Sequence, residues 1–151
     1  MSQPLLVRNV ITIAASPQKV WDALVNPAQT RRYMFGCETV SDWKAGSPLL
    51  WQGNFEGVDL VAVKGFIKAI RPAEYLAYTV FDPNIGMEDI PENYLTVTYE
   101  LSEKDGQTVL TVTQSGFETV ADGARRFKEA SNDGHGWEPI LIEIKKLVES
   151  A

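Results

Sequence analysis

Apolar and polar residues alternate through the middle of the chain as they do in antiparallel strands. The clearest case is residues 94–102, where Leu95, Val97, Tyr99 and Leu101 share one face and mostly polar residues occupy the other. Turn-forming residues separate six segments of this kind, which we expect at 38–40, 48–52, 59–70, 75–81, 94–102 and 107–115. The pattern predicts a meander of hairpins that is buried on one face.

Helical patterns occupy both ends of the chain. A first strand over 7–14 leads to Ser16 and Pro17, a typical helix start, and Asn26-Pro27 ends that helix before a second short one at 28–35. Apolar residues recur at helical spacing from Trp137 to Val148, after a helical segment at 118–131 and a Gly-rich break at 132–136. A helix of about fifteen residues is marginal alone, so we expect it to pack on the meander. The fold class is therefore α+β, with a curved antiparallel sheet of about seven strands around a long C-terminal helix.

Composition and charge narrow the classes of protein. The 151 residues show no repeat or linker, which predicts one domain over 1–151. A net charge of −6 disfavours nucleic acid as a partner, and the Arg31-Arg32 and Arg125-Arg126 pairs are expected to be solvated. The sequence has no stretch of membrane-spanning length or secretory leader, so a cytoplasmic protein is expected. Cys37 is the single cysteine and is expected to be a small, partly buried residue.

Several segments carry a family resemblance across nearly the whole chain. They are residues 11–24, 31–36, 65–67 with 70–72, 106–117 and 136–141. In this order they resemble the START-like (SRPBCC) superfamily and, more narrowly, the activator of heat-shock protein (Hsp90) ATPase homologue-like family. The resemblance implies a helix-grip fold with an apolar cavity between the sheet and the C-terminal helix. The break at 132–136 departs from the family's more continuous helix and bears on the shape of the cavity mouth.

The expected cavity residues are large apolar side chains and one inward amide. An apolar pocket with few polar groups is the usual small-molecule site, although the same aromatics could simply fill the core. Gln114 shares the inward face of its strand with Leu110 and Val112, so its amide needs a partner: backbone, the hydroxyl of Tyr99 or Tyr78, or a ligand. The full candidate set is Trp51, Phe66, Tyr78, Tyr99, Gln114, Phe117, Trp137, Leu141 and Ile144.

The sequence contains few other candidates for a functional site. His135, the sole histidine, lies in the Gly-rich break without a second histidine or a nucleophile motif, so an exposed loop residue is expected. The long segment 82–93 carries four carboxylates, and its Ile85, Met87 and Ile90 are expected to cover the cavity mouth or to meet a partner. The sequence contains no nucleotide-binding, hydrolase or metal-spacing motif. No catalytic residue, metal or cofactor is predicted.

Three functions are compatible with these features. The leading hypothesis is a domain that binds an apolar small molecule or lipid-like ligand, without catalysis or with weak catalysis. The first alternative is a chaperone-interacting module that acts through its surface, with segment 82–93 and Arg31-Arg32 as contacts. The second is a polyketide cyclase-like enzyme. A monomer and a homodimer are both compatible with the sequence.

Overall fold

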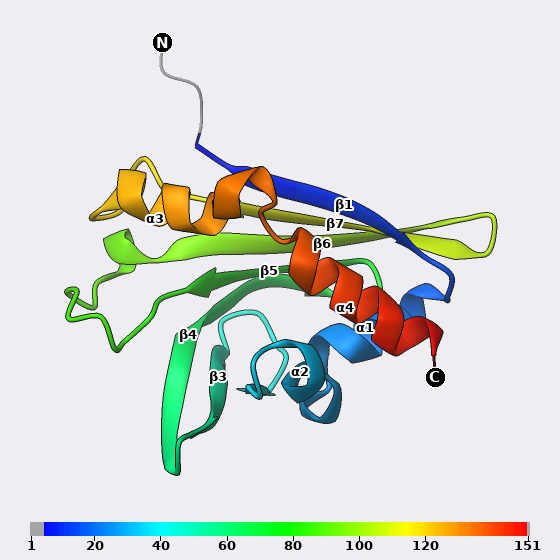
Figure 1. Ribbon diagram of the computed structural model, residues 1–151, viewed down its shortest axis with the longest axis horizontal. Coiled ribbons are helices and arrows are strands. Elements are labelled where there is room, and N and C mark those ends of the chain that lie inside the picture. The colour runs from blue at the N-terminus through cyan, green and yellow to red at the C-terminus, as the bar shows by residue number, and fades with distance from the viewer. Residues whose placement is uncertain (1–4, 151) are drawn as a thin grey trace.

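The computed structural model describes residues 5–150 and contains one curved antiparallel sheet (Figure 1). Its seven strands follow the order β1-β7-β6-β5-β4-β3-β2, so consecutive strands from β2 to β7 are neighbours and β1 closes the sheet beside β7. The predicted meander is therefore confirmed. The strands are β1 (Val7–Ile13), β2 (Glu38–Ser41), β3 (Pro48–Phe55), β4 (Val58–Arg71), β5 (Tyr75–Val80), β6 (Leu95–Lys104) and β7 (Gln107–Ser115).

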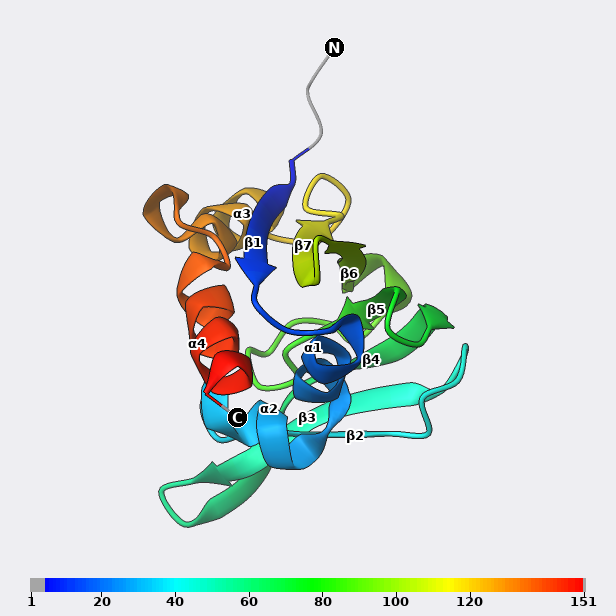
Figure 2. The same ribbon diagram turned by 90° about the vertical axis from the view of Figure 1, so that its right-hand side faces the viewer.

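The sheet bends around an interior that the helices close. Seen from the side, the strands sweep from β1 round to β2, with the helices lying in the concavity (Figure 2). Strand β4 has an extra, unpaired residue at Ala62 opposite Trp51/Gln52 of β3 and another at Lys68 opposite β5, and irregularities of this kind bend strands. On β6 the apolar residues of the predicted inner face are all buried.

Two short helices follow β1, as the sequence predicts. In α1 (Pro17–Val25) the Ser16 hydroxyl accepts a hydrogen bond from the Lys19 amide at 3.3 Å. In α2 (Pro27–Tyr33) the Asn26 side chain caps the amide of Ala28 at 3.0 Å. Each helix also begins with proline, whose missing N–H costs nothing at that position.

The C-terminal helical region is divided in two. It consists of α3 (Gly123–Ser131), a single 3-10 turn at Asn132–Gly134, and α4 (Glu138–Glu149). The first helix starts later than the predicted residue 118, because Thr119 donates to the Gly116 carbonyl in a turn and Asp122 has a left-handed backbone, φ 54°.

The gripped helix is α4, which has 12 residues. Its buried face of Leu141, Ile144 and Val148 joins the main core, which also contains Tyr78, Tyr99 and the buried residues of α1. A smaller apolar cluster lies around Phe117 and includes Val7, the first residue of β1. The fold is thus the expected α+β helix-grip. Within residues 5–150 no helix has the length and apolarity needed to cross a membrane.

Candidate functional site

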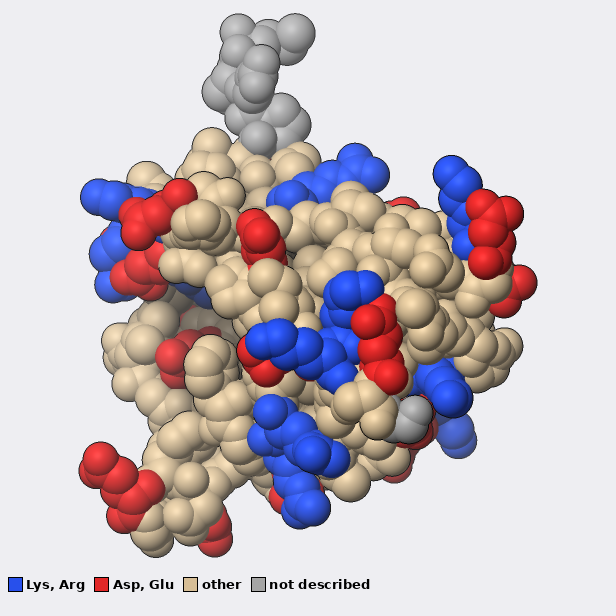
Figure 3. Space-filling model, turned by 45° about the vertical axis from the view of Figure 1, so that its right-hand side comes forward, with Lys and Arg blue, Asp and Glu red and all other residues tan. Residues whose placement is uncertain are grey.

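An apolar cavity lies between the concave face of the sheet and the α3–α4 region. Its volume is about 570 Å³. Seen from outside, the surface is hollowed between α3 and the β3–β4 hairpin (Figure 3). Strands β3 to β7 supply one wall, and the turn after α2 and the α3–α4 junction supply the rest. The lining residues are Met34, Phe35, Cys37, Trp51, Ala62, Val63, Tyr78, Val80, Val97, Gln114, Glu129, Ala130, Asn132, Gly136, Trp137 and Ile140.

Four of the predicted residues line this cavity together. They are Trp51, Tyr78, Gln114 and Trp137, which come from β3, β5, β7 and the start of α4. Tyr99 lies behind this wall, with its ring at 5.5 Å from that of Tyr78 and 6.2 Å from that of Trp137. Distant parts of the sequence thus converge on one aromatic wall.

Three other predicted residues belong to the core and not to the cavity lining. Leu141 and Ile144 are each 1% exposed and are packed in the main core. Phe117 is buried in the smaller cluster, where its ring meets that of Phe127 on α3 edge-to-face at 5.3 Å. Its role in the structure is to attach α3 to the sheet.

Phe66 is a correction, because it faces away from the cavity. Its side chain is 51% exposed on the outer face of β4, with its ring 6.5 Å from that of Tyr94. Neighbouring strand residues point to opposite faces, and here Ile67 takes the inner one. Residues 60–63 are apolar at both parities, but Lys64 and Lys68 share the parity of Phe66, so the sequence itself indicates that this side of β4 is the outer one.

Gln114 has an internal partner in the cavity wall. The indole Nε1–H of Trp137 donates to the Gln114 Oε1 at 3.0 Å. Neither predicted tyrosine serves this purpose, because the Tyr78 and Tyr99 hydroxyls bond to each other at 2.6 Å. The interior polar groups therefore form two separate pairs.

The tyrosine hydroxyls and the thiol at or behind the wall are held in their neutral forms. Burial raises the pKa of the Tyr78 and Tyr99 hydroxyls well above 10.0, and burial also raises the pKa of the Cys37 thiol. None of the three becomes a nucleophilic anion or a general base near neutral pH. They can donate hydrogen bonds or pack against an apolar ligand.

The junction between α3 and α4 is held by Asn9, a residue that the sequence reasoning missed. Its Oδ1 accepts from the Trp137 amide at 2.9 Å and its Nδ2 donates to the His135 carbonyl at 3.0 Å. Gly136 lies between them with φ 54°, and a Cβ there would stand 2.3 Å from the Asn9 Oδ1. Asn9 shares the inward parity of Val7 and Ile13, which is the same signal that identified Gln114.

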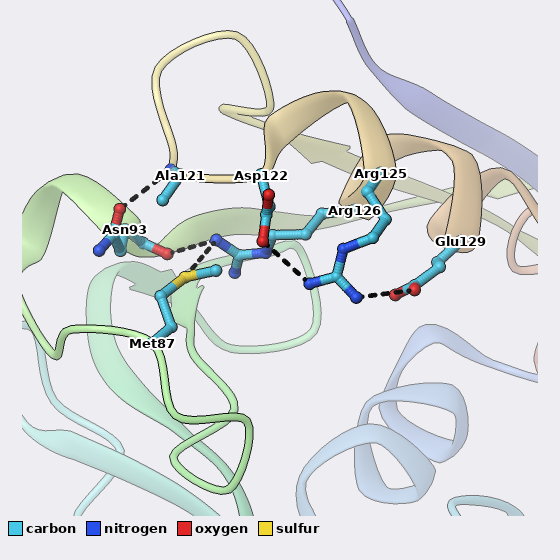
Figure 4. Close-up of polar contacts among 7 residues, drawn as sticks. All are labelled: Met87, Asn93, Ala121, Asp122, Arg125, Arg126 and Glu129. Carbon is cyan, nitrogen blue, oxygen red and sulfur yellow. Dashed lines mark hydrogen bonds and ion pairs between the residues drawn. The ribbon is translucent and has the colours of Figure 1, made fainter.

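A polar network ties segment 82–93 to α3 (Figure 4). Arg126 Nη1 donates to the Asn93 carbonyl at 2.9 Å and lies 3.4 Å from the Met87 sulfur, and the Ala121 amide donates to Asn93 Oδ1 at 3.0 Å. Burial, and secondly the adjacent Arg125, lowers the Arg126 pKa.

Of the two roles expected for segment 82–93, the cover over the cavity mouth is therefore wrong, and contact with a partner stays a prediction. No residue of 82–93 lines the cavity, because the segment is held beside α3, and Ile85 remains 47% exposed. The mouth is bordered instead by Glu129 and Asn132 of the α3 region and by Phe35, whose side chain is 79% exposed. His135 is exposed, as expected, with Glu138 at 3.9 Å.

We find no candidate metal site in the part of the chain that the structure describes. No three His, Cys, Asp or Glu residues there lie together in an arrangement that could hold a metal ion.

A curved sheet closed by a terminal helix over an apolar cavity defines the class of helix-grip proteins. Within that class, the model of the activator of Hsp90 ATPase homologue 1-like family matches residues 14–149, and the chain belongs to this family. No curated protein matches the chain significantly.

Solved structures agree with this assignment. A protein of Cytophaga hutchinsonii has 35% sequence identity and a TM-score of 0.76, with 99% of this chain and 97% of that chain covered. The Aha1 dimer of Colwellia psychrerythraea has 18% identity and a TM-score of 0.65, with coverage of 95% and 96%. CalU16 of Micromonospora echinospora has 20% identity and a TM-score of 0.67, with coverage of 95% and 75%. The last two, being so divergent in sequence, show the fold alone.

Proposed function

We propose that this protein binds an apolar small molecule or lipid-like ligand in the cavity between the sheet and the α3–α4 region. The observation that carries the proposal is a space of about 570 Å³ whose wall consists mainly of apolar and aromatic side chains. Ligand pockets typically measure about 300–1,000 Å³ and combine such a wall with a few placed polar groups. Gln114, whose Oε1 accepts from the Trp137 indole, supplies such a group here.

The direct test introduces a large side chain into the cavity and measures the loss of ligand affinity. Ala62 on β4 lines the cavity and is partly buried, whereas Ala45 is exposed in the loop before β3, so Ala62→Trp and Ala45→Trp introduce the same side chain inside and outside. Native mass spectrometry of freshly purified protein, screened against a panel of lipids and aromatic metabolites, identifies binders. We expect Ala62→Trp to weaken a binder at least tenfold and Ala45→Trp to leave it unchanged. Failure of every apolar compound to bind the unaltered protein would reject the proposal.

A chaperone-interacting role is the second candidate, and the family description supports it. Its contacts would be surface groups: Arg31 and Arg32 are exposed on α2, and most of segment 82–93 is exposed. Stimulation of the ATPase of purified Hsp90 tests this role. An Arg31→Glu/Arg32→Glu variant would lose the stimulation while keeping apolar-ligand binding, and this difference separates the two functions.

The cyclase-like alternative receives less support from the cavity chemistry. A cyclisation that needs a general base requires a group near its pKa at neutral pH. Tyr78 and Cys37, by contrast, have pKa values raised by burial. Binding therefore describes the site better than acid–base catalysis.

A further inference from the structure

The cavity lining contains few charged side chains. Among the described residues that line it, Glu129 alone is charged at neutral pH, and no Lys or Arg side chain contributes to the lining. Glu129 lies on the rim, where it pairs with the exposed Arg125 at 3.4 Å. An anion entering the cavity would lose its hydration without gaining a cationic partner, which is costly.

The Gln114 amide is oriented by its partner. An indole N–H only donates, so its bond of 3.0 Å from Trp137 fixes Oε1 toward the indole and Nε2 away from it. Nε2 donates to no group of the described chain, and no fully buried side-chain nitrogen or oxygen there lacks a partner. Since Gln114 lines the cavity and is only partly buried, this nitrogen is available to a ligand.

Tyr78 lies on the same row of the sheet as Gln114. Tyr78 is paired with Val97, and Val97 with Gln114, so the three side chains stand side by side across β5, β6 and β7 on the inner face. The Tyr78–Tyr99 pair holds two hydroxyl hydrogens but makes one mutual hydrogen bond. Because Tyr78 is 1% exposed and its hydroxyl is bonded to that of Tyr99 in the core, Gln114 Nε2 is the donor of this row that remains available to a ligand.

We propose that the cavity selects neutral apolar molecules that carry a hydrogen-bond acceptor such as a carbonyl oxygen, which accepts from Gln114 Nε2, and that it rejects carboxylates. The inference rests on the proposed binding function and adds the chemical class of the ligand. Long-chain fatty acids are excluded by it, whereas neutral ketones, quinones and esters are included.

Three probes of one shape test this selection. They are 2-acetylnaphthalene, which has a carbonyl acceptor, 2-ethylnaphthalene, which has none, and 2-naphthoate, which is an anion at pH 7.5. Binding is measured by titration calorimetry to the unaltered protein, to Gln114→Leu and to Gln114→Met, with Gln107→Leu as the matched change at an exposed position of the same strand. The second Gln114 variant preserves the test if the first one does not fold.

The measured quantity is the ratio of the affinities for the ketone and the hydrocarbon, because the hydrophobicity of each probe cancels between variants. We expect both Gln114 variants to lower this ratio by about three- to tenfold, as for the loss of one hydrogen bond. Gln107→Leu should leave the ratio unchanged, and naphthoate should bind the unaltered protein at least tenfold more weakly than the ketone.

The outcomes separate this inference from the proposed function. If all three probes bind but the ratio is the same in the Gln114 variants, or if naphthoate binds as tightly as the ketone, the selection is refuted and the binding function stands. If none of the probes and no compound of the wider panel binds, both are refuted.

Discussion

Asn9 offers the sharpest test of how the cavity is built. Replacing it with alanine removes the hydrogen bonds to the Trp137 amide and the His135 carbonyl, which lie on either side of Gly136. The Trp137 amide belongs to the first turn of α4, where amides have no partner within the helix. At about 0.5–1.5 kcal/mol for each bond, Asn9→Ala should lower the free energy of unfolding by about 1–3 kcal/mol.

A graded series distinguishes the two hydrogen bonds. Asn9→Asp keeps the acceptor for Trp137 and places a negative charge near the start of α4, where the helix dipole favours it. It loses the donor to His135, so its stability should lie between those of the unaltered protein and Asn9→Ala. Thr12→Ala, at an exposed position of the same strand, should change the stability by less than about 0.5 kcal/mol.

The assay is urea denaturation followed by circular dichroism, combined with 2-acetylnaphthalene binding. Because Trp137 orients Gln114, we expect Asn9→Ala to weaken ketone binding even under conditions in which it is fully folded. An Asn9→Ala protein as stable as Thr12→Ala, or one less stable but with unaltered ketone binding, would refute the view that Asn9 positions the α4 start for the cavity.

Three further predictions address other parts of the structure. Tyr99→Phe leaves the buried Tyr78 hydroxyl without its protein partner and should cost about 1–3 kcal/mol in urea denaturation; unchanged stability would contradict a paired hydroxyl. Arg126→Met removes the bond to the Asn93 carbonyl, so amide hydrogen exchange should accelerate in α3 more than in α4, and equal acceleration would argue against a local tie. The Glu149 carboxylate accepts hydrogen bonds from the Ala14 amide and from Lys145, and these bonds lower its pKa below the usual 4.5. The charged carboxylate therefore stabilises the fold above pH 4.5, and this contribution is lost as the pH falls through the lowered pKa. Glu149→Gln should flatten the acid side of the curve of Tm against pH, and a curve parallel to that of the unaltered protein would refute the assignment.

The element order and the core of the fold are predictable because each strand or helix carries a local signal. The alternation in β6 and β7 places Tyr99 and Gln114 on the inner face without any knowledge of tertiary contacts. The partner of Gln114 was not predictable in this way. The Trp137 indole reaches it only because the chain turns at Gly136, and that turn depends on a contact with β1.

The incorrect assignments have different origins. Phe66 shares its parity on β4 with Lys64 and Lys68, so the sequence carried a signal that Phe66 lies on the outer face. The position of segment 82–93 depends on Arg126 of α3, more than thirty residues further along the chain, and no local pattern reveals that contact. Asn9 resembles the first case, because a polar residue at an inward strand position is a visible signal.

The division of the C-terminal helical region explains why this fold retains a cavity. Helix α3 is only loosely packed: it has no buried residue, and residues with a left-handed backbone adjoin both of its ends. It is held by two contacts, that of Phe127 with Phe117 and that of Arg126 with segment 82–93. In α4, by contrast, Leu141 and Ile144 are each 1% exposed and pack into the main core above the sheet. The cavity lies where the buried face of α4 has ended and α3 has not replaced it, and the Trp137–Gln114 bond stands at that boundary. The break at 132–136 is therefore the part of the sequence that leaves the cavity open, and the Gln114 amide beside it is the group that we propose selects the ligand.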